Sequence, residues 1–337
     1  MHKIKTAMLG LLLCGALPAT AGTLADIQQK DELTCGVSEG TPGFSNPDAS
    51  GRWVGLDVDI CRAVSAAVLG DQEKIKFVPL ASKQKIVALA AGQVDMTSRT
   101  TTWTMKRDTK EGVDFTAIVY YDGQGFMVNK ALGLTSAKEL DGASVCVTTG
   151  TTTELNLADF ARANGINIEA VVFEGKKEAF NSYKQGRCDA FTTDMSQLAS
   201  WRSTLPNSDD HVILKDVISK EPLSPLVRHG DNQWKDAVTW VINGLIEAEE
   251  KGVTQANVDQ LASSSQDPTI QRMLGVSGDM GGYIGLDQDW LKRAIAAVGN
   301  YGEIYDRNLG ENTRLKLDRG INSLWSQGGL FYSPPIR

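Results

Sequence analysis

Residues 98–108 read SRTTTWTMKRD, and they directly follow a short apolar segment at residues 93–97 that predicts a strand. The stretch supplies one hydroxyl side chain after another and then an arginine, Arg107. Hydroxyl groups donate single hydrogen bonds, whereas a guanidinium presents a planar fork that matches a carboxylate. The stretch therefore indicates a socket for a small anion or zwitterion. A Thr-rich turn that leads into a helix with an exposed arginine is the simpler alternative.

The residues on the N-terminal side of this stretch alternate between strand-like and helix-like segments. The sequence predicts strands at residues 32–37, 75–80 and 93–97, and helices at residues 57–69 and 82–91. Such an alternation is typical of an α/β fold with a parallel sheet and helices on its faces. Ligands of these folds bind beyond the carboxyl ends of the strands. Three loops are expected to leave those ends, at residues 38–44, 80–83 and 98–107.

A second series of strands and helices follows a glycine-interrupted, strand-like connection at residues 119–129. Its predicted strands are residues 143–148, 168–173 and 189–193, and its predicted helices are residues 150–163, 176–185 and 196–203. A Pro-containing connection at residues 220–228 would return the chain to the first series. The remainder is expected to be mostly helical, at residues 233–251, 289–298 and 314–325. We therefore expect two lobes with a cleft between them: residues 22–124 with 226–337, and residues 125–225.

Three features of these segments have both a structural and a functional interpretation. Thr151 and Glu154 fit a capping box, which fixes the start of a helix and leaves free N–H groups that can bind an anion. Asp194, between a strand and a helix, is either an N-cap or a carboxylate of the cleft. Phe44, a large aromatic residue in a polar loop, either covers the core or forms a wall of a pocket. The residues alone leave these alternatives open.

The N-terminus has the features of a secretory signal sequence at residues 1–21. Two lysines precede an apolar run at residues 7–17, and a small-residue cleavage site follows at residues 19–21, so that Gly22 would begin the mature protein. The apolar run is too short to span a bilayer. Cys14 resembles a lipoprotein cysteine, but the small residue that usually precedes one is missing. We therefore expect export with a cleaved signal sequence rather than lipid attachment.

Charge and cysteine content narrow the possible partners. Removing residues 1–21 deletes two lysines and takes the formal net charge from -7 to -9, and an acidic protein is a poor candidate for binding nucleic acid. Four cysteines remain, which indicates two disulfides among three possible pairings. Cys35–Cys61 and Cys146–Cys188 are the expected pairs, because each would lie within one lobe; four small buried side chains are the alternative. The sequence contains no CxxC spacing, so it does not indicate a cysteine metal site, and we expect no cofactor.

Six blocks of this sequence occur in the order that characterises one known family. They are GTPGFSNPDASGRWVGLDVDICRAV (residues 40–64), SRTTTWTMKRD (98–108), YYDGQGFMV (120–128), GTTTELNLADF (150–160), CDAFTTDMSQL (188–198) and KEPLSPLVRHGDNQW (220–234). Together they resemble the periplasmic solute-binding proteins of polar amino-acid ABC importers (family 3). The likeness covers nearly the whole chain after residue 21. It is greatest to the general L-amino-acid-binding branch, which includes glutamate/glutamine/aspartate/asparagine binders and whose long C-terminal tail this chain shares.

The resemblance implies a type II periplasmic binding protein, in which two Rossmann-like lobes joined by two hinge strands close around one amino acid. It also implies a role for each residue of the site. Arg107 would grip the α-carboxylate of the ligand with help from Thr102, and Thr100 would lie beside the pocket. Thr152 would add hydroxyl and N–H donors from the second lobe, and Asp194 would receive the α-ammonium group.

Other positions would shape the part of the cleft around the side chain of the ligand. Phe44 falls where the loop of the first lobe approaches the cleft, and Thr41 stands where shorter relatives place a stacking aromatic residue. That departure is compatible with smaller polar ligands. The further expected contacts are Ser38, Ser82, Lys83 and Arg99. Of these, Lys83 or Arg99 would favour an acidic side chain.

The resemblance therefore implies binding of free L-amino acids in the periplasm, with a broad or polar and acidic preference such as glutamate, glutamine, aspartate and asparagine. A monomer would deliver them to an inner-membrane ABC permease. A dehydratase-like enzyme on the same scaffold is the main alternative, because a cleft carboxylate could act as a general acid. Against it, the exported chain has only two histidines, neither in a block that lines the cleft, and no GxSxG, HExxH or P-loop motif. A sensor ectodomain is a third alternative.

Overall fold

A sheet of five strands in the order β4-β1-β5-β14-β6 forms the centre of the first lobe. The computed structural model describes residues 22–337, so the expected signal sequence at residues 1–21 and Cys14 lie outside the described residues. The strands are β1 (Leu33–Val37), β4 (Ile75–Pro79), β5 (Met96–Thr97), β6 (Val113–Phe115) and β14 (Leu226–Arg228). β1 pairs in parallel with β4 and β5, whereas β14 is antiparallel to β5 and β6.

Helices on both sides of this sheet complete the first lobe. α2 (Leu56–Leu69) connects the β1 side to β4, α3 (Lys85–Ala90) connects β4 to β5, and α4 (Met105–Lys110) follows β5. All but one of the residues of α2 are buried, and the helix ends at Gly70, whose positive φ of 71° suits glycine. α3 begins three residues later than the predicted helix at 82–91, so Ser82 and Lys83 lie in the loop before it. This loop and the one at residues 98–104 leave the same sheet edge.

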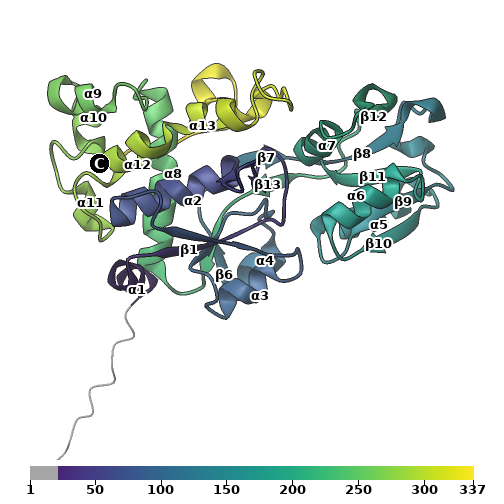
Figure 1. The fold of residues 1–337 in the computed structure, drawn as a ribbon, viewed down its shortest axis with the longest axis horizontal. Coiled ribbons are helices and arrows are strands. Elements are labelled where there is room, and N and C mark those ends of the chain that lie inside the picture. The colour runs from purple at the N-terminus through teal and green to yellow at the C-terminus, as the bar shows by residue number, and fades with distance from the viewer. Residues whose placement is uncertain (1–21) are drawn as a thin grey trace, which may run out of the picture.

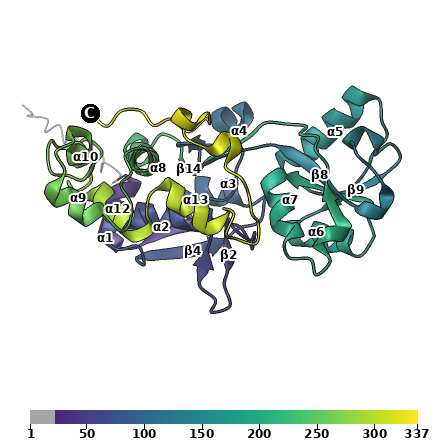
Figure 2. The ribbon, with the colours of Figure 1, turned by 90° about the horizontal axis from the view of Figure 1, so that it is seen from above.

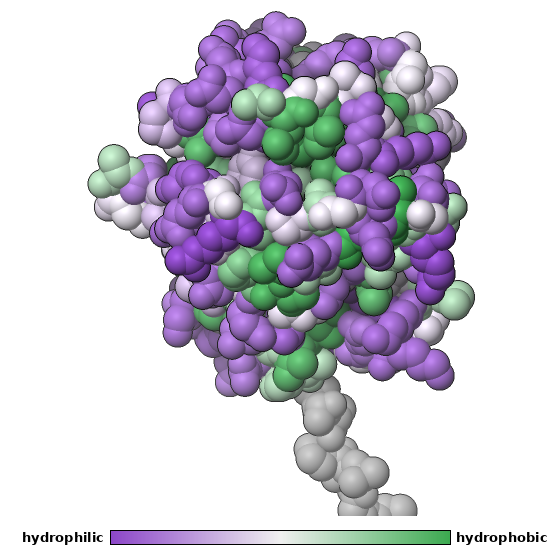
Figure 3. Space-filling model, turned by 90° about the vertical axis from the view of Figure 1, so that its right-hand side faces the viewer, coloured by the Kyte–Doolittle hydropathy of each residue, from purple (hydrophilic) through white to green (hydrophobic). Residues whose placement is uncertain are grey.

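The second lobe repeats the architecture with a five-stranded sheet in the order β10-β9-β11-β8-β12. Its strands are β8 (Gln124–Asn129), β9 (Ser144–Thr148), β10 (Glu169–Phe173), β11 (Ala190–Asp194) and β12 (His211–Ile213), and its helices are α5 (Thr152–Asn164), α6 (Lys176–Lys184) and α7 (Met195–Arg202). The predicted strands and helices of this series are all present, with ends shifted by a few residues. Figure 3 shows that hydrophilic residues cover most of the outer end of this lobe, around smaller hydrophobic patches.

Two short strands link the lobes, as Figures 1 and 2 show from two directions. β7 (Tyr120–Asp122) and β13 (Glu221–Leu223) pair antiparallel, with Glu221 opposite Asp122 and Leu223 opposite Tyr120. Both are the connections that the sequence predicted at residues 119–129 and 220–228. Because only two strands cross between the sheets, the lobes can change their relative orientation by bending at this ribbon.

The C-terminal third of the chain packs on the first lobe (Figure 1). Its helices are α8 (Asn232–Glu250), α9 (Val258–Ser264), α10 (Pro268–Met273), α11 (Met280–Tyr283), α12 (Trp290–Val298) and α13 (Tyr301–Asn308). Large side chains from these helices, including Trp234, Trp290 and Tyr301, join the core of the first lobe. No helix among residues 22–337 is long and apolar enough to cross a membrane.

One predicted helix, at residues 314–325, is wrong. Residues 314–319 form neither a helix nor a strand, and Lys316 has a positive φ of 49°; two 3₁₀ turns follow, at Gly320–Asn322 and Trp325–Gln327. Leu315 and Leu317 pack against the core while the residues between and beside them are exposed, which is a period of two rather than of 3.6. α13 and the N-terminal helix α1 (Thr23–Lys30) were not predicted.

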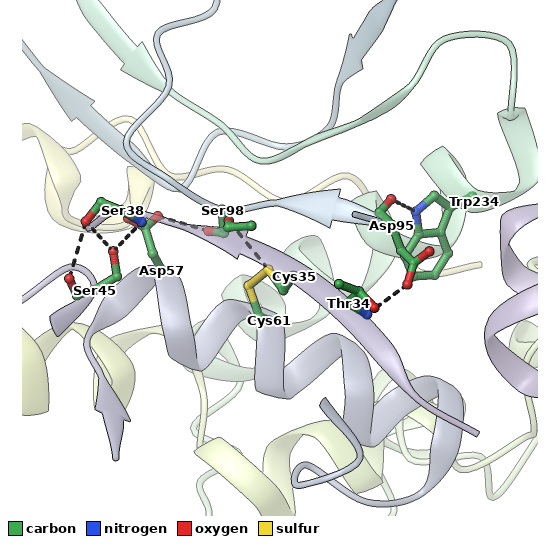
Figure 4. Close-up of a disulfide and its surroundings, with 10 residues drawn as sticks. Thr34, Cys35, Ser38, Ser45, Asp57, Cys61, Asp95, Ser98 and Trp234 are labelled. Atoms are coloured by element: carbon green, nitrogen blue, oxygen red, sulfur yellow. Dashed lines mark hydrogen bonds between the residues drawn. A yellow bond between two sulfur atoms is a disulfide. The ribbon is translucent and has the colours of Figure 1, made fainter. Parts of the chain in front are cut away.

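The predicted cysteine pairing is confirmed. Cys35 in β1 is bonded to Cys61 in α2 (Figure 4), and Cys146 in β9 is bonded to Cys188 just before β11. The Cα atoms of the two pairs are 6.3 Å and 5.7 Å apart. Each bond ties a helix or loop to the sheet of its own lobe, so neither restricts movement between the lobes.

Candidate ligand-binding site

The stretch at residues 98–108 forms the wall of the cleft on the first lobe. Its start is fixed to α2, because the Ser98 hydroxyl donates to Asp57 Oδ1 at 2.9 Å (Figure 4). Its end is fixed by Thr104, which caps α4 by accepting from the Arg107 N–H at 3.3 Å. The Arg107 guanidinium donates one hydrogen bond to the Thr102 carbonyl at 3.0 Å and is only 8% exposed. Burial lowers the pKa of Arg107, but a guanidinium stays charged at physiological pH.

Two residues of this wall carry unsatisfied polar atoms. Thr100 adopts a φ of 42°, which is unusual for a β-branched residue, and its buried hydroxyl has no hydrogen-bond partner in the part of the chain that the structure describes. The Arg99 guanidinium donates to the Leu80 carbonyl at 2.7 Å and to the Ser82 hydroxyl at 3.3 Å, but its buried Nη1 has no partner. Buried polar groups are normally paired. Strain and unpaired donors at one place indicate a site that a polar ligand completes.

The facing wall on the second lobe is the start of α5. Thr151 caps this helix by accepting from the Glu154 N–H at 3.3 Å, and the Glu154 carboxylate accepts in turn from the Gly150 N–H at 2.8 Å. Thr152 follows the cap, with its hydroxyl oxygen 3.4 Å from that of Thr102 on the first lobe. The helix start and the hydroxyl of Thr152 therefore face Arg107 and Thr102 across the cleft, and free N–H groups there favour an anion.

Asp194 ends β11 and is 5% exposed. It is the N-cap residue of α7, as the sequence allowed, but its side chain accepts no capping hydrogen bond from the backbone of that helix. Instead its carboxylate accepts a hydrogen bond from Gln197, whose side-chain oxygen accepts from the Lys176 ammonium group. Burial raises the pKa of Asp194 to about 8, and the nearby Asp122 carboxylate adds to this effect. Burial also lowers the pKa of Lys176. Among residues 22–337, no cation bonds directly to the Asp194 carboxyl group.

Glu221, in the hinge strand β13, is a buried residue of the cleft that the sequence did not reveal. Its Oε2 accepts from the hydroxyls of Thr102 and Thr152, the latter at 2.9 Å. Its Oε1 accepts from Asn156 at 2.7 Å and from the Ser219 hydroxyl at 2.7 Å. One carboxylate therefore joins the hinge, the first lobe and the second lobe. The Pro-containing pattern around Glu221 predicted only a connection.

Two chambers that share lining residues lie between the lobes. The inner one, of about 20 Å³, is lined by residues of both lobes, among them Arg107, Thr100, Thr102, Thr152, Asp194, Arg99 and Ser82. The outer one, of about 330 Å³, shares Arg99 and Lys176 with the inner chamber and is also lined by Ser38 and Thr41. The structure thus brings together seven of the ten residues predicted to contact the ligand and places Ser38 at the outer chamber.

Lys85 is a further cation of the inner chamber that the sequence analysis missed. It opens α3, is 4% exposed, and forms no hydrogen bond or ion pair within the described residues 22–337. Burial, and then the neighbouring Arg107 and Arg99, hold the pKa of Lys85 well below its usual value. The only signal in the sequence was its place two residues after Lys83, at the expected sheet edge.

Two predicted contacts do not line either chamber. Phe44 is 1% exposed and packs in the core of the first lobe, with its ring 5.7 Å from that of Tyr120, so the structure places it under the cleft rather than in its wall. Its apolar ring is one of the side chains of the first-lobe core. Lys83 does not line the inner chamber; it lines a larger groove between the lobes, which shares Arg107 and Thr152 with that chamber, and it forms an exposed ion pair with Glu174 of the second lobe at 3.0 Å.

A two-lobed α/β protein whose lobes are joined by two strands around a buried polar cleft is a type II periplasmic binding protein, a class that binds solutes by closure. Comparison with known proteins agrees with this class. The chain belongs to the bacterial extracellular solute-binding proteins, family 3, whose sequence profile matches residues 33–256. The expected fold and family are thereby confirmed, and the family is one of binding proteins rather than enzymes.

Several relatives match the whole chain. The glutamate/glutamine/aspartate/asparagine-binding protein BztA of Rhodobacter capsulatus is 53% identical and aligns over 99% of each chain. The general L-amino acid-binding periplasmic protein AapJ of Rhizobium johnstonii is 51% identical over 100% of this chain and 99% of its own. A solved ABC transporter/periplasmic binding protein from Brucella ovis with glutathione bound is 51% identical, with a TM-score of 0.92 over 94% of this chain and 100% of its own. These relatives therefore share the C-terminal region that the family profile does not cover.

Proposed function

We propose that this protein binds a free L-amino acid in the periplasm, with a preference for acidic or amide side chains, and delivers it to an ABC importer. The observation that carries the proposal is the arrangement of opposite charges in one buried chamber. Arg107 and the start of α5 offer donors to a carboxylate, and Asp194 offers an acceptor to an ammonium group. These are the two charged groups that every free amino acid carries. The relatives BztA and AapJ, named for amino-acid binding, support this assignment.

Closure of the lobes is the proposed mechanism. The inner chamber of about 20 Å³ has room for roughly one water molecule, so an amino acid is admitted only when the lobes separate. The ligand then contacts Arg107 on the first lobe and Asp194 on the second only when the cleft closes around it. Its binding free energy therefore shifts the population towards the closed state, which the importer can recognise.

The balance of charge in the chamber supports the preference for acidic side chains. Four basic side chains line the inner chamber, Lys85, Arg99, Arg107 and Lys176, against one acidic side chain, that of Asp194, with the Glu221 carboxylate bonded to the Thr102 and Thr152 hydroxyls beside it. The α-carboxylate and α-ammonium groups of a ligand pair with Arg107 and Asp194 and leave the other basic side chains without an acidic partner. A second carboxylate on the ligand would supply such a partner and would favour their charged forms. Lys85 and the unpaired Nη1 of Arg99 are the donors best placed to receive it.

Titration calorimetry with wild-type protein tests the proposal. We expect one-to-one binding of L-glutamate and L-glutamine, with the ligand recovered unchanged. N-acetyl-L-glutamate, which lacks the ammonium group, is expected to bind at least about 100-fold more weakly, because Asp194 loses its charged partner. Equal affinity for the acetylated compound, or no binding of any common L-amino acid, would contradict the proposal. Consumption of the ligand would favour the enzyme alternative instead.

The outer chamber supports a second class of ligand, the γ-glutamyl peptides. It adjoins the inner chamber at Arg99 and Lys176 and measures about 330 Å³, which is room for a group attached to the end of a glutamyl side chain. Glutathione keeps the free ammonium and α-carboxylate groups of its glutamyl residue, and the similar protein from Brucella ovis was solved with glutathione bound. In the same calorimetric series we expect glutathione to bind in competition with L-glutamate. Binding that adds to that of L-glutamate would place it outside this cleft.

Replacing Lys85 separates recognition of the side chain from recognition of the backbone groups. For Lys85→Gln we expect the Kd for L-glutamate to rise about tenfold and the Kd for L-glutamine to change less than about threefold, because only the former offers Lys85 a charged partner. Lys83→Gln is the matched control: it removes the same charge two residues away, where the side chain is exposed and paired with Glu174. If Lys85→Gln raised the Kd for both ligands by the same factor, Lys85 would not contribute to recognition of the ligand side chain.

A further inference from the structure

The region after the family profile, residues 257–337, reaches back to the hinge. Asn322, in the 3₁₀ turn Gly320–Asn322, lies beside β7 and is 4% exposed. Its Oδ1 accepts from the Tyr121 N–H at 2.7 Å, and its Nδ2 donates to the Tyr121 carbonyl at 3.0 Å. One side-chain amide thus forms both hydrogen bonds that a neighbouring strand would form with this residue. We call residues 257–337 the C-terminal extension.

Aromatic residues of the extension hold the same strand. The Tyr301 hydroxyl donates to the Val119 carbonyl at 2.6 Å. The Tyr305 ring stacks on that of Tyr120 with centroids 6.2 Å apart, and the Phe331 ring meets that of Tyr121 edge-on at 5.5 Å. Three successive residues, 119–121, are therefore fixed to the first lobe through the extension.

The next residue along the chain belongs to the other lobe. The Asp122 carboxylate accepts hydrogen bonds from the hydroxyl and the backbone N–H of Ser196, at the start of α7. Gly123 follows, where a Cβ atom would lie 2.2 Å from Val217 Cγ1 and 2.9 Å from the Ser219 carbonyl oxygen. Tyr121 and Asp122 are thus held to opposite lobes. Only the peptide unit that joins these two residues lies between the two points of attachment.

The opposite edge of the hinge is attached to the ligand-binding stretch. β13 pairs with β7, and on its other side the Trp103 N–H donates to the Pro222 carbonyl at 2.8 Å. The Ser224 N–H donates to the Thr101 carbonyl at 3.0 Å. A continuous set of backbone and amide hydrogen bonds therefore leads from Asn322 through both hinge strands to the loop that carries Thr102.

We propose that Asn322 is a positioning residue, through which the C-terminal extension confines the bending of β7 to the Tyr121–Asp122 junction. Without its two hydrogen bonds, the backbone of Tyr121 is released on this edge, and bending extends back to the residues that Tyr301 and Tyr305 hold. The unliganded protein then samples more open arrangements, and closing it around a ligand costs more conformational entropy. The extension thus sets how readily the cleft closes, although it lies outside the chambers and touches no ligand.

Asn322→Ala tests this role, with Asn257→Ala as the matched control. Asn257 also forms one accepted and one donated backbone bond, with the Thr254 N–H at 2.7 Å and the Gly252 carbonyl at 3.0 Å, but far from the hinge. For Asn322→Ala we expect the Kd for L-glutamate to rise about fivefold, because a hinge with more freedom loses more conformational entropy when the cleft closes. The radius of gyration from X-ray scattering should rise for the unliganded protein and match wild type at saturating L-glutamate. Asn257→Ala should lower Tm but change neither quantity.

The scattering measurement on unliganded protein requires no ligand, so it decides the proposal separately from the proposed function. A wild-type radius of gyration for Asn322→Ala, with a loss of Tm like that of the control, would reduce the extension to a purely structural element and overturn the proposal. Tyr301→Phe is a milder second variant, which removes only the hydrogen bond to Val119. It should shift the radius of gyration in the same direction, and an unchanged value in a folded Tyr301→Phe protein would also count against the proposal.

Discussion

Arg107→Ala is expected to abolish high-affinity binding of every amino acid, whatever its side chain. The guanidinium is the main positive group that faces the start of α5, and it is nearly inaccessible to water. Truncating one member of a buried, hydrogen-bonded charge pair typically costs about 2–5 kcal/mol, which corresponds to roughly a 30- to 5,000-fold rise in Kd. Calorimetry with both L-glutamate and L-glutamine measures this effect, and the two losses should be similar because both ligands carry the same α-carboxylate.

Glu221 makes the expected loss larger. This carboxylate accepts the hydroxyls of Thr102 and Thr152, which lie beside the proposed position of the ligand carboxylate. The Glu221 carboxylate and the ligand carboxylate would repel each other unless a cation lies near both. Arg107 is such a cation, because the charge of Glu221 raises the pKa of Arg107 and so opposes the lowering effect of burial. Removing Arg107 therefore leaves the ligand carboxylate facing an uncompensated like charge.

Two further variants identify the cause of the loss. Arg107→Lys keeps the charge but not the planar fork, so an intermediate affinity would show that bidentate geometry contributes. Lys106→Ala removes a cation from the adjacent, 79% exposed side chain and should bind as wild type. A folded Arg107→Ala protein that kept an affinity within about threefold of wild type would exclude Arg107 as the carboxylate site.

The sequence predicted the parts of this site that depend on local chemistry. The strands at 32–37, 75–80 and 93–97 were recognisable because apolar segments alternate with amphipathic ones. Thr151 and Glu154 were recognisable as a helix start because capping depends on residues only three positions apart. The fold class and the position of the binding edge follow from such local signals, and the resemblance to a family then assigned Arg107 and Asp194 their roles.

The parts that were missed depend on contacts between distant residues. Glu221 meets Thr102 across 119 positions of sequence, and no local pattern around either residue indicates the other. Lys176 reaches Gln197 and the region of Asp194 only because α6 and α7 belong to the same lobe. The polar neighbours of Phe44 in the chain left its place open between core and pocket wall, and the family resemblance placed it at the cleft, whereas its neighbours in space are apolar. Whether a single side chain is buried depends on tertiary packing, which local sequence patterns do not predict.

Asp194→Asn is the second variant with a large expected effect, and its size should depend on pH. Burial raises the pKa of Asp194 to about 8 in the unliganded protein, so below pH 8 this carboxyl group is mostly protonated. The ammonium group of a ligand favours the ionised form, and binding must therefore release a proton. The affinity of wild-type protein for L-glutamine should consequently fall as pH decreases from 8 to 6, by up to about tenfold per pH unit. L-Glutamine is the suitable ligand because its side chain does not titrate.

In Asp194→Asn the carboxyl group is replaced by an amide that never ionises. We expect its affinity for L-glutamine to be at least about 100-fold below wild type at pH 8, but the two proteins to converge towards pH 6, where wild-type Asp194 is itself neutral. Asp189→Asn, at an exposed position just before the same strand, removes an equal charge outside the cleft and should keep the wild-type pH profile. If wild type and Asp194→Asn differed by the same factor at both pH values, a proton on Asp194 would not control binding. If they bound equally at pH 8, the ammonium group would be held elsewhere.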